Sequence, residues 1–222
     1  NVGLEYYSDD FRDDEPFIPD SLERYSLEDR ILGLLEKGIP GEDIFSLIRK
    51  EGILPHGESG RIVYRESYNR ILKIYDAAAP LLKNRVVEES VIEIKEFKLK
   101  LRNNLYDNKL IFYRGGRLRP KDRLRAWIHH LAACFTGKFG DDFSTLFFAS
   151  GENIRFRFAE KSHELLEVLT DIYEAGMMDT VPLFPLSSYE YAVQLCDNNR
   201  EDALKSAAGK FKNTGTACDL SD

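Results

Sequence analysis

The sequence has little cysteine and no long hydrophobic run, and these two shortages limit the class of protein. Its three cysteines, Cys134, Cys196 and Cys218, lie far apart and form no CxxC pair. This spacing indicates neither a zinc site nor a disulfide framework, and it favours a reducing compartment such as the cytoplasm. No apolar run approaches the roughly 20 residues that cross a bilayer, and the start of the chain shows no secretory signal. We therefore expect a soluble cytoplasmic protein with no membrane partner.

The sequence also lacks the motifs of common phosphate-binding and hydrolytic sites. Thr136-Gly137-Lys138 resembles only the end of a Walker loop, because the leading glycine is missing. No Gly-x-Ser-x-Gly elbow of serine hydrolases occurs. His129 and His130 are adjacent on a predicted helix, where neighbouring side chains point about 100 degrees apart. We therefore expect no shared metal ion, one packed and one solvated histidine, and no cofactor in this domain.

The balance of charge is acidic. The 222 residues carry a formal net charge of -7, and 43% of them are hydrophobic, which is enough for one sizeable core. The acidic balance argues against bulk non-specific nucleic-acid binding, although it permits a local basic surface. The chain begins with Asn1 instead of methionine and ends at Asp222 in a polar stretch. We interpret it as a fragment of a longer protein.

The most informative stretch, residues 108–135, predicts a strand, a glycine turn and a basic helix. Residues 110–113 are apolar, branched or aromatic and suit a mostly buried strand. Gly115-Gly116 predicts the turn, since glycine adopts backbone angles that other residues resist. Pro120 fits the first helical turn, and apolar residues then recur at spacings of three and four. Trp127 shares that apolar face, so we expect it in the core rather than as a base-stacking platform.

The remaining patterns predict an α/β fold with a mixed central sheet flanked by helices. Residues 110–113 are expected to join two earlier strands in an antiparallel meander. The other strands are predicted near residues 86–94, 97–106, 145–149 and 154–158. The other helices are predicted near residues 26–37, 42–50, 61–79, 162–175, 187–196 and 201–210.

Caps and composition suggest where these elements begin and end. Ser26 is a predicted N-cap, Ser187 or Ser188 another, and Gly176 a predicted C-cap. We expect residues 1–84 to form a helical N-terminal unit with an extended arm over residues 1–20. Residues 85–222 are expected to form an α/β core, packed with that unit as one compact domain.

The order of strands and helix matches the plan of PD-(D/E)xK nucleases. In that fold an acid ends one core strand, and an acid-x-Lys on the next strand completes a Mg²⁺ site before a helix follows. The corresponding positions here are Asn103, Phe112 and Arg114. Asparagine lacks the charge of a carboxylate, and phenylalanine cannot ligate magnesium. We therefore expect a degenerate nuclease-like site, with no catalytic and no metal-binding residue.

Five stretches carry motifs that occur together in one known family. Residues 117–131, RLRPKDRLRAWIHHL, are similar to the family signature LRAKDRLRLWLEHL. The other four similarities are residues 15–25 with EPF…LERYQL, residues 52–57 with GxLPxG, residues 104–106 with LDNLY, and residues 176–188 with G…PLPFFPxSS. They follow the family order over about residues 13–210. Together they resemble the C-terminal domain of the RecC family, the gamma chain of exodeoxyribonuclease V.

The resemblance implies a non-catalytic subunit of a RecBCD-type helicase–nuclease that processes double-strand breaks for homologous recombination. In that family this domain is similar to the RecB nuclease domain but lacks its metal-binding acids. RecC splits the duplex, guides the strands and helps read the Chi sequence, so the implied partners are DNA and RecB-like and RecD-like subunits. Lys100 departs from the family, in which this strand more often has glycine.

Two basic groups are candidate surfaces for DNA or partner subunits. The first comprises Arg114, Arg117, Arg119, Lys121, Arg123 and Arg125, and the second comprises Lys98, Lys100 and Arg102. The functional interpretation is contact with phosphates or with a partner. The structural interpretation is that Asp122 and other acids neutralise several of them while the arginines cover the core.

Two alternative functions stay open at this point. An active Mg²⁺-dependent DNA nuclease would need other acids, for which Glu88, Glu89, Glu93 and Asp107 are available. A purely protein-binding module would need no DNA contact. The arrangement of side chains around Asn103 is therefore the most useful structural observation.

Overall fold

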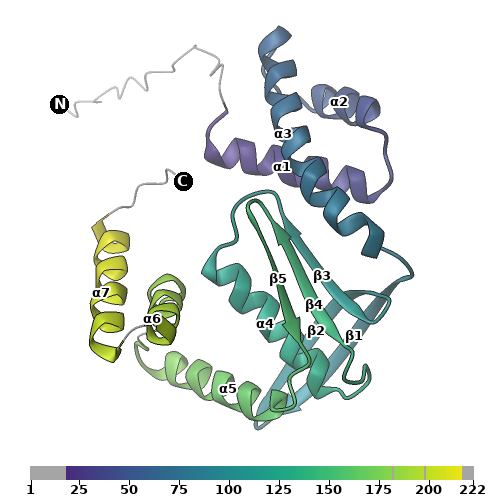
Figure 1. Cartoon of the computed structure of the whole chain (residues 1–222). Coiled ribbons are helices and arrows are strands. Elements are labelled where there is room, and N and C mark those ends of the chain that lie inside the picture. Colours follow the sequence, from purple (N-terminus) through teal and green to yellow (C-terminus); the bar gives the residue numbers. More distant parts are fainter. Residues whose placement is uncertain (1–18, 182, 198, 217–222) are drawn as a thin grey trace, which may run out of the picture. The chain divides into compact units, whose positions relative to one another are not determined.

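The structure, a computed structural model, describes residues 19–181, 183–197 and 199–216, with side chains described as far as residue 212 (Figure 1). Residues 1–18 of the predicted arm lie outside this range. Within it are seven α-helices, one short 3₁₀-helix and one five-stranded mixed sheet, which confirms the predicted α/β class. Among the described residues no helix has the length and apolar character needed to cross a bilayer. The chain divides into two compact units, Asn1–Ile71 and Leu72–Asp222.

The first unit is helical. It contains α1 (Ser21–Glu36), α2 (Gly41–Lys50) and most of α3 (Gly57–Ala78). Ile31, Ile44 and Ile48 are fully buried in it. The prediction that α1 begins at Ser26 was wrong: Asp20 Oδ1 accepts from Glu23 N at 2.7 Å, and Asp20 N donates back to Glu23 Oε2 at 3.0 Å. This capping box starts the helix one turn earlier, on residues that are exposed and therefore lack the apolar pattern.

The second unit is built on the sheet. After the 3₁₀-helix η1 (Ala79–Leu81) come β1 (Arg85–Ile94), β2 (Phe97–Tyr106) and β3 (Lys109–Arg114), then β4 (Ser144–Ala149) and β5 (Glu152–Arg157). The strand order follows the chain, and all neighbours are antiparallel except β3 and β4. The meander and the mixed sheet are therefore as predicted. The parallel pair requires a crossover, which is α4 (Pro120–Phe135), at the predicted place.

The core lies between the sheet and α4. Ile92, Ile94 and Leu101 pack against Leu131 of α4, and farther along the sheet Leu105 and Leu110 pack against Ala133 and Cys134. Trp127 is half-buried against the first of these clusters, and its ring stacks on the His130 ring at 5.4 Å. The prediction of a core tryptophan is confirmed.

Three further helices follow the sheet: α5 (Ser162–Met178), α6 (Pro185–Asp197) and α7 (Arg200–Thr216). Gly176 does not end α5, which continues to Met178. The helix α6 begins at Pro185 instead of Ser187 or Ser188, because proline suits the first helical turn. In the first unit, α3 begins at Gly57, four residues before the predicted start.

Candidate functional site

A row of three side chains crosses β1, β2 and β3 on the sheet face that α4 covers. Glu88 lies opposite Asn103 in the register of β1 and β2, so the two point to the same face. Continuing the pairing of Leu105 with Leu110 by two residues brings Phe112 of β3 next to Asn103. The structure therefore places together two of the positions that a PD-(D/E)xK comparison selects, with Glu88 beside them.

The ring of His129 on α4 closes this row from above. His129 Nδ1 lies 2.6 Å from Asn103 Oδ1, so the ring N–H donates to the amide oxygen. The edge of the same ring meets Phe112 at a centroid distance of 5.6 Å, and Phe112 stacks on Phe147 behind it. Burial lowers the pKa of His129, and the positive charge of Arg125 lowers it further. The site is thus a hydrogen-bonded amide–imidazole pair against an aromatic wall.

The prediction for the two histidines is half right. His130 is fully buried, as expected for the packed member: Nε2 donates to the Arg157 carbonyl at 2.8 Å, and Nδ1 accepts from the Thr145 hydroxyl at 2.9 Å. His129 is half-buried and bonded to Asn103, whereas solvent was expected. Sequence reasoning missed this contact because the two residues are 26 positions apart and nothing local links them.

The third nuclease-like position, Arg114, ends β3 and forms an ion pair with Asp122 of α4. Arg114 Nη1 lies 2.6 Å from Asp122 Oδ2, and both side chains are largely buried. The same Asp122 oxygen accepts from the backbone N–H of Arg119 at 3.1 Å, just before the first residue of α4. Arg114 therefore ties the strand to the start of the helix, and its charge is directed inward.

The four acids considered for a nuclease are all engaged with other side chains. Glu88 pairs with Lys138, Glu89 with Arg102 at 3.5 Å and Glu93 with Lys98 at 2.9 Å. Asp107 accepts from the Asn84 amide at 2.6 Å. Glu88 is the one of the four that faces the row with Asn103. In the part of the chain that the structure describes, no three His, Cys, Asp or Glu side chains gather in a group that could hold a metal ion.

The basic candidates fall into two classes. Arg114, Lys98 and Arg102 are in the ion pairs described above. Arg123 pairs with Glu152 at 2.5 Å, and its guanidinium lies 4.9 Å from the centre of the Tyr189 ring on α6. The exposed candidates are Arg117, Arg119, Lys121, Arg125 and Lys100.

Four of the exposed candidates gather at one place in the sequence of elements. Arg117 and Arg119 lie in the loop after β3, and Lys121 and Arg125 occupy the first two turns of α4, one turn apart. The Gly116 carbonyl of that loop accepts from the Ser150 backbone at 3.1 Å, which holds the loop against the β4–β5 turn. The exposed positive charge is thus carried by an anchored loop and a helix start.

Comparison with known proteins follows from this geometry. The sequence profile of the RecC C-terminal domain matches residues 1–196. The chain is also similar to the RecBCD enzyme subunit RecC of Escherichia coli (strain K12), with 24% identity over 197 residues. That similarity covers 86% of this chain and 17% of the relative, so the chain spans less than a fifth of the relative's length. The match to the profile confirms the family resemblance found in the motifs, and the chain belongs to the RecC C-terminal domain family.

Proposed function

We propose that this chain is a non-catalytic domain of a RecBCD-type DNA-processing complex, which holds DNA strands and partner subunits. The observation that carries the proposal is the occupation of the nuclease-like row. Asn103 is bonded to His129, Phe112 packs against Phe147, and Arg114 is paired with Asp122. The relative named RecC is a subunit of the RecBCD enzyme, which supports the assignment to a multi-subunit complex with RecB-like and RecD-like partners.

The chemistry of these three side chains argues against magnesium catalysis at this place. Magnesium takes oxygen ligands in near-octahedral geometry, and Phe112 offers none. The Asn103 oxygen already accepts from His129, and it carries no charge to offset that of the metal. A lysine that stabilises a developing charge must keep its head group available, whereas Arg114 is held by Asp122. This domain accordingly contributes binding and positioning, and it needs no cofactor.

The proposed DNA contact is the loop after β3 and the start of α4. Arg117, Lys121 and Arg125 are exposed, and no carboxylate among the described residues pairs with them. Phosphate contacts of this kind position a nucleic acid without reading its sequence. The strip on β2 is a weaker candidate, because Lys98 and Arg102 are matched with glutamates across the hairpin.

DNA binding by the 222-residue chain tests this proposal. The variants Arg117→Glu, Lys121→Glu and Arg125→Glu are compared with Lys161→Glu, which makes the same charge change at an exposed residue before α5. Each of the first three is expected to weaken binding to a duplex with a single-stranded end. Each lost contact also lowers the slope of log affinity against log salt by about 0.7 to 0.9. Equal effects of all four variants, or binding that does not depend on salt, would contradict the proposed surface and favour a protein-binding module.

A second function, an active Mg²⁺-dependent nuclease, is favoured by one observation. Glu88 lies opposite Asn103 on the face that His129 covers, so a carboxylate does stand in the row. The measurement is cleavage of linear DNA by the 222-residue chain in Mg²⁺ or Mn²⁺, with Glu88→Gln as the variant and Glu96→Gln, in the exposed β1–β2 turn, as its control. Cleavage that is lost only in Glu88→Gln would establish the nuclease and overturn the non-catalytic proposal.

A further inference from the structure

The outer edge of β1 has none of the usual protections of a sheet edge. Among the described residues β1 pairs with β2 alone, so one side of this ten-residue strand is without a neighbour, at the margin of the sheet in Figure 1. An open edge offers a row of N–H and C=O groups to any extended chain, and proteins normally guard it with lysine, proline, a bulge or a short strand. The strand β1 contains neither lysine nor proline, and its register with β2 runs without a bulge.

The opposite edge of the same sheet shows what a protected edge looks like. The strand β5 has six residues against ten in β1, and it carries Arg155 and Arg157 as exposed side chains. In β1 the exposed large side chains are valines: Val86 is 56% exposed, Val87 42% and Val91 60%. The two edges of one sheet are therefore treated differently, and only β5 has the short, charged form that discourages strand addition.

The charges of β1 are satisfied from within the unit. Glu89 and Glu93 pair with Arg102 and Lys98 of β2, and Glu88 pairs with Lys138. Glu89 and Glu93 still expose about seven-tenths of their side chains, on the same face as Val87 and Val91. The open edge thus presents alternating valines and carboxylates, which is the pattern that the alternating apolar and basic residues of β2 already match on the other side.

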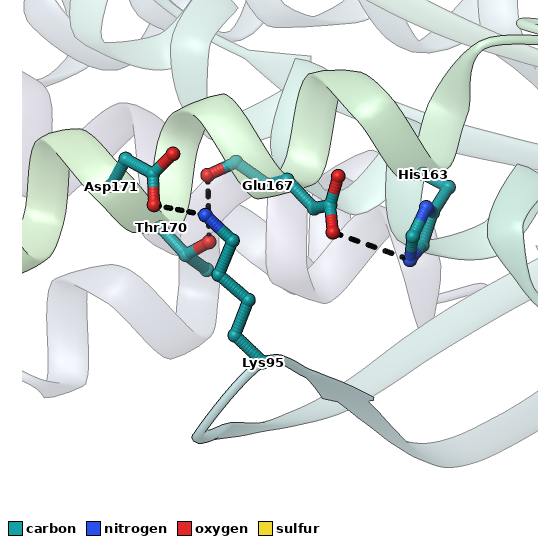
Figure 2. A network of polar contacts seen from close by, with 5 residues as sticks. All are labelled: Lys95, His163, Glu167, Thr170 and Asp171. Carbon is teal, nitrogen blue, oxygen red and sulfur yellow. Dashed lines mark hydrogen bonds and ion pairs between the residues drawn. The ribbon is translucent and has the colours of Figure 1, made fainter.

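The strand is also held in place, which is a requirement for a template. At the β1–β2 turn, Lys95 donates to Asp171 of α5, and Thr170 of α5 donates to the Glu167 carbonyl beside it at 2.8 Å (Figure 2). Phe97 meets Tyr173 of α5 edge-on at 5.6 Å. A partner strand that joins this anchored edge loses less entropy than one that must first order a loose hairpin.

We propose that β1 accepts an extended segment of a partner protein as a sixth strand, and that this segment alternates β-branched or apolar residues with lysine or arginine. Main-chain hydrogen bonds supply the affinity, and contacts with Val87, Glu89 and Val91 supply the selectivity. The inference does not depend on DNA binding by this chain.

A second copy of this chain is the less suitable occupant. In an antiparallel pairing of two β1 strands centred on Ser90, Glu89 of one copy lies diagonal to two glutamates of the other. Centring the pair between Glu89 and Ser90 gives Glu88 the same two neighbours. Like charges at such positions destabilise a strand pair, whereas a basic partner strand meets opposite charge in either register.

The test uses a strand whose fit to β1 is already seen. The probe is a blocked synthetic peptide with the sequence of residues 97–106, FKLKLRNNLY, added to the 222-residue chain. We expect saturable binding by fluorescence anisotropy, with slower amide hydrogen exchange in β1. Val91→Lys puts a like charge against the peptide and should weaken binding by about tenfold or more. Val91→Thr keeps a β-branched, uncharged residue and should bind as the parent chain does. A scrambled peptide of the same composition should not bind.

Three outcomes would overturn the inference. They are absence of binding by the peptide, binding that Val91→Lys leaves unchanged, and self-association of the chain that Val91→Lys abolishes. Asn153→Lys on the β5 edge serves as the control for added charge. Circular dichroism checks that each variant folds, and Val87→Lys replaces Val91→Lys if that variant does not. DNA affinity of Val91→Lys should equal that of the parent chain, which separates failure here from failure of the proposed function.

Discussion

Replacing Asn103 by aspartate changes one atom type in the row and should reverse the titration of His129. In the parent chain burial and Arg125 lower the pKa of His129 from its usual value of about 6.5. In Asn103→Asp the His129 Nδ1–H faces a carboxylate at a separation of about 2.6 Å. Two opposite charges about 4 Å apart near a protein surface attract by roughly 4 kcal/mol, which equals about three pKa units. Because burial of both groups opposes this gain, the expected rise is about one to three units.

The same substitution reverses the pH dependence of stability. A lowered folded-state pKa in the parent chain means that His129 contributes stability above about pH 6.5 and loses it as pH falls. A raised folded-state pKa in Asn103→Asp means that the contribution is complete below about pH 6.5 and is lost as pH rises. The free energy of unfolding of the variant, relative to the parent chain, should therefore increase as pH falls from 8 to 6.

Proton NMR of the imidazole ring, combined with denaturant unfolding at several pH values, measures both effects. Asn104→Asp is the matched control, because Asn104 lies one residue along β2, is exposed and accepts from Arg85 at 3.2 Å. It adds the same charge on the opposite face of the sheet and should leave the His129 pKa unchanged. If Asn103→Asp also leaves it unchanged, then the amide–imidazole bond does not exist in solution, and the account of the row is refuted.

Three further substitutions probe the rest of the molecule. Burial lowers the pKa of His130, so it contributes stability above about pH 6.5 that is lost at lower pH; unfolding of His130→Gln should depend less on pH between 7 and 5. In the first unit, Arg70→Met leaves the buried carboxylate of Glu28 unpaired and should cost about 1–3 kcal/mol in denaturant unfolding, whereas Arg65→Met on exposed α3 surface should cost little. Removing the helix cap in Asp20→Ala should cost about 1 kcal/mol, and Asp20→Ser should restore most of it; equal stability of both would contradict the cap.

The elements of the sheet and of α4 could be predicted closely from the sequence. The bounds of α4, Pro120–Phe135, follow from a helix-starting proline and a strong apolar period, and β1 to β3 follow from alternation and the Asp107-Asn108 turn. Both turn residues have positive φ, 43° and 62°, a conformation that Asp and Asn tolerate. Helix starts were predicted less well. First turns are exposed, so the start of α1 depends on the Asp20–Glu23 capping box rather than on apolar spacing.

The contacts of the candidate site could not be predicted, because they join residues that only the register of the sheet and the placement of α4 bring together. Glu88 meets Lys138 across 50 positions, and Asn103 meets His129 across 26. The residue types at the row were readable, since a missing carboxylate is visible in any sequence. What replaces the missing chemistry is a matter of tertiary packing, which local patterns do not encode.

The three nuclease-like positions share a physical role that explains why they need not return to acids and lysine. Asn103 and Phe112 each contact His129 of α4, and Arg114 pairs with Asp122 of the same helix. In an enzyme such positions face a metal and its bound water, and the helix must be held elsewhere. Here they hold the helix to the sheet. A carboxylate at Phe112 would be buried against Phe147 with no base among its described contacts, so recovering metal ligands would first cost the packing of α4.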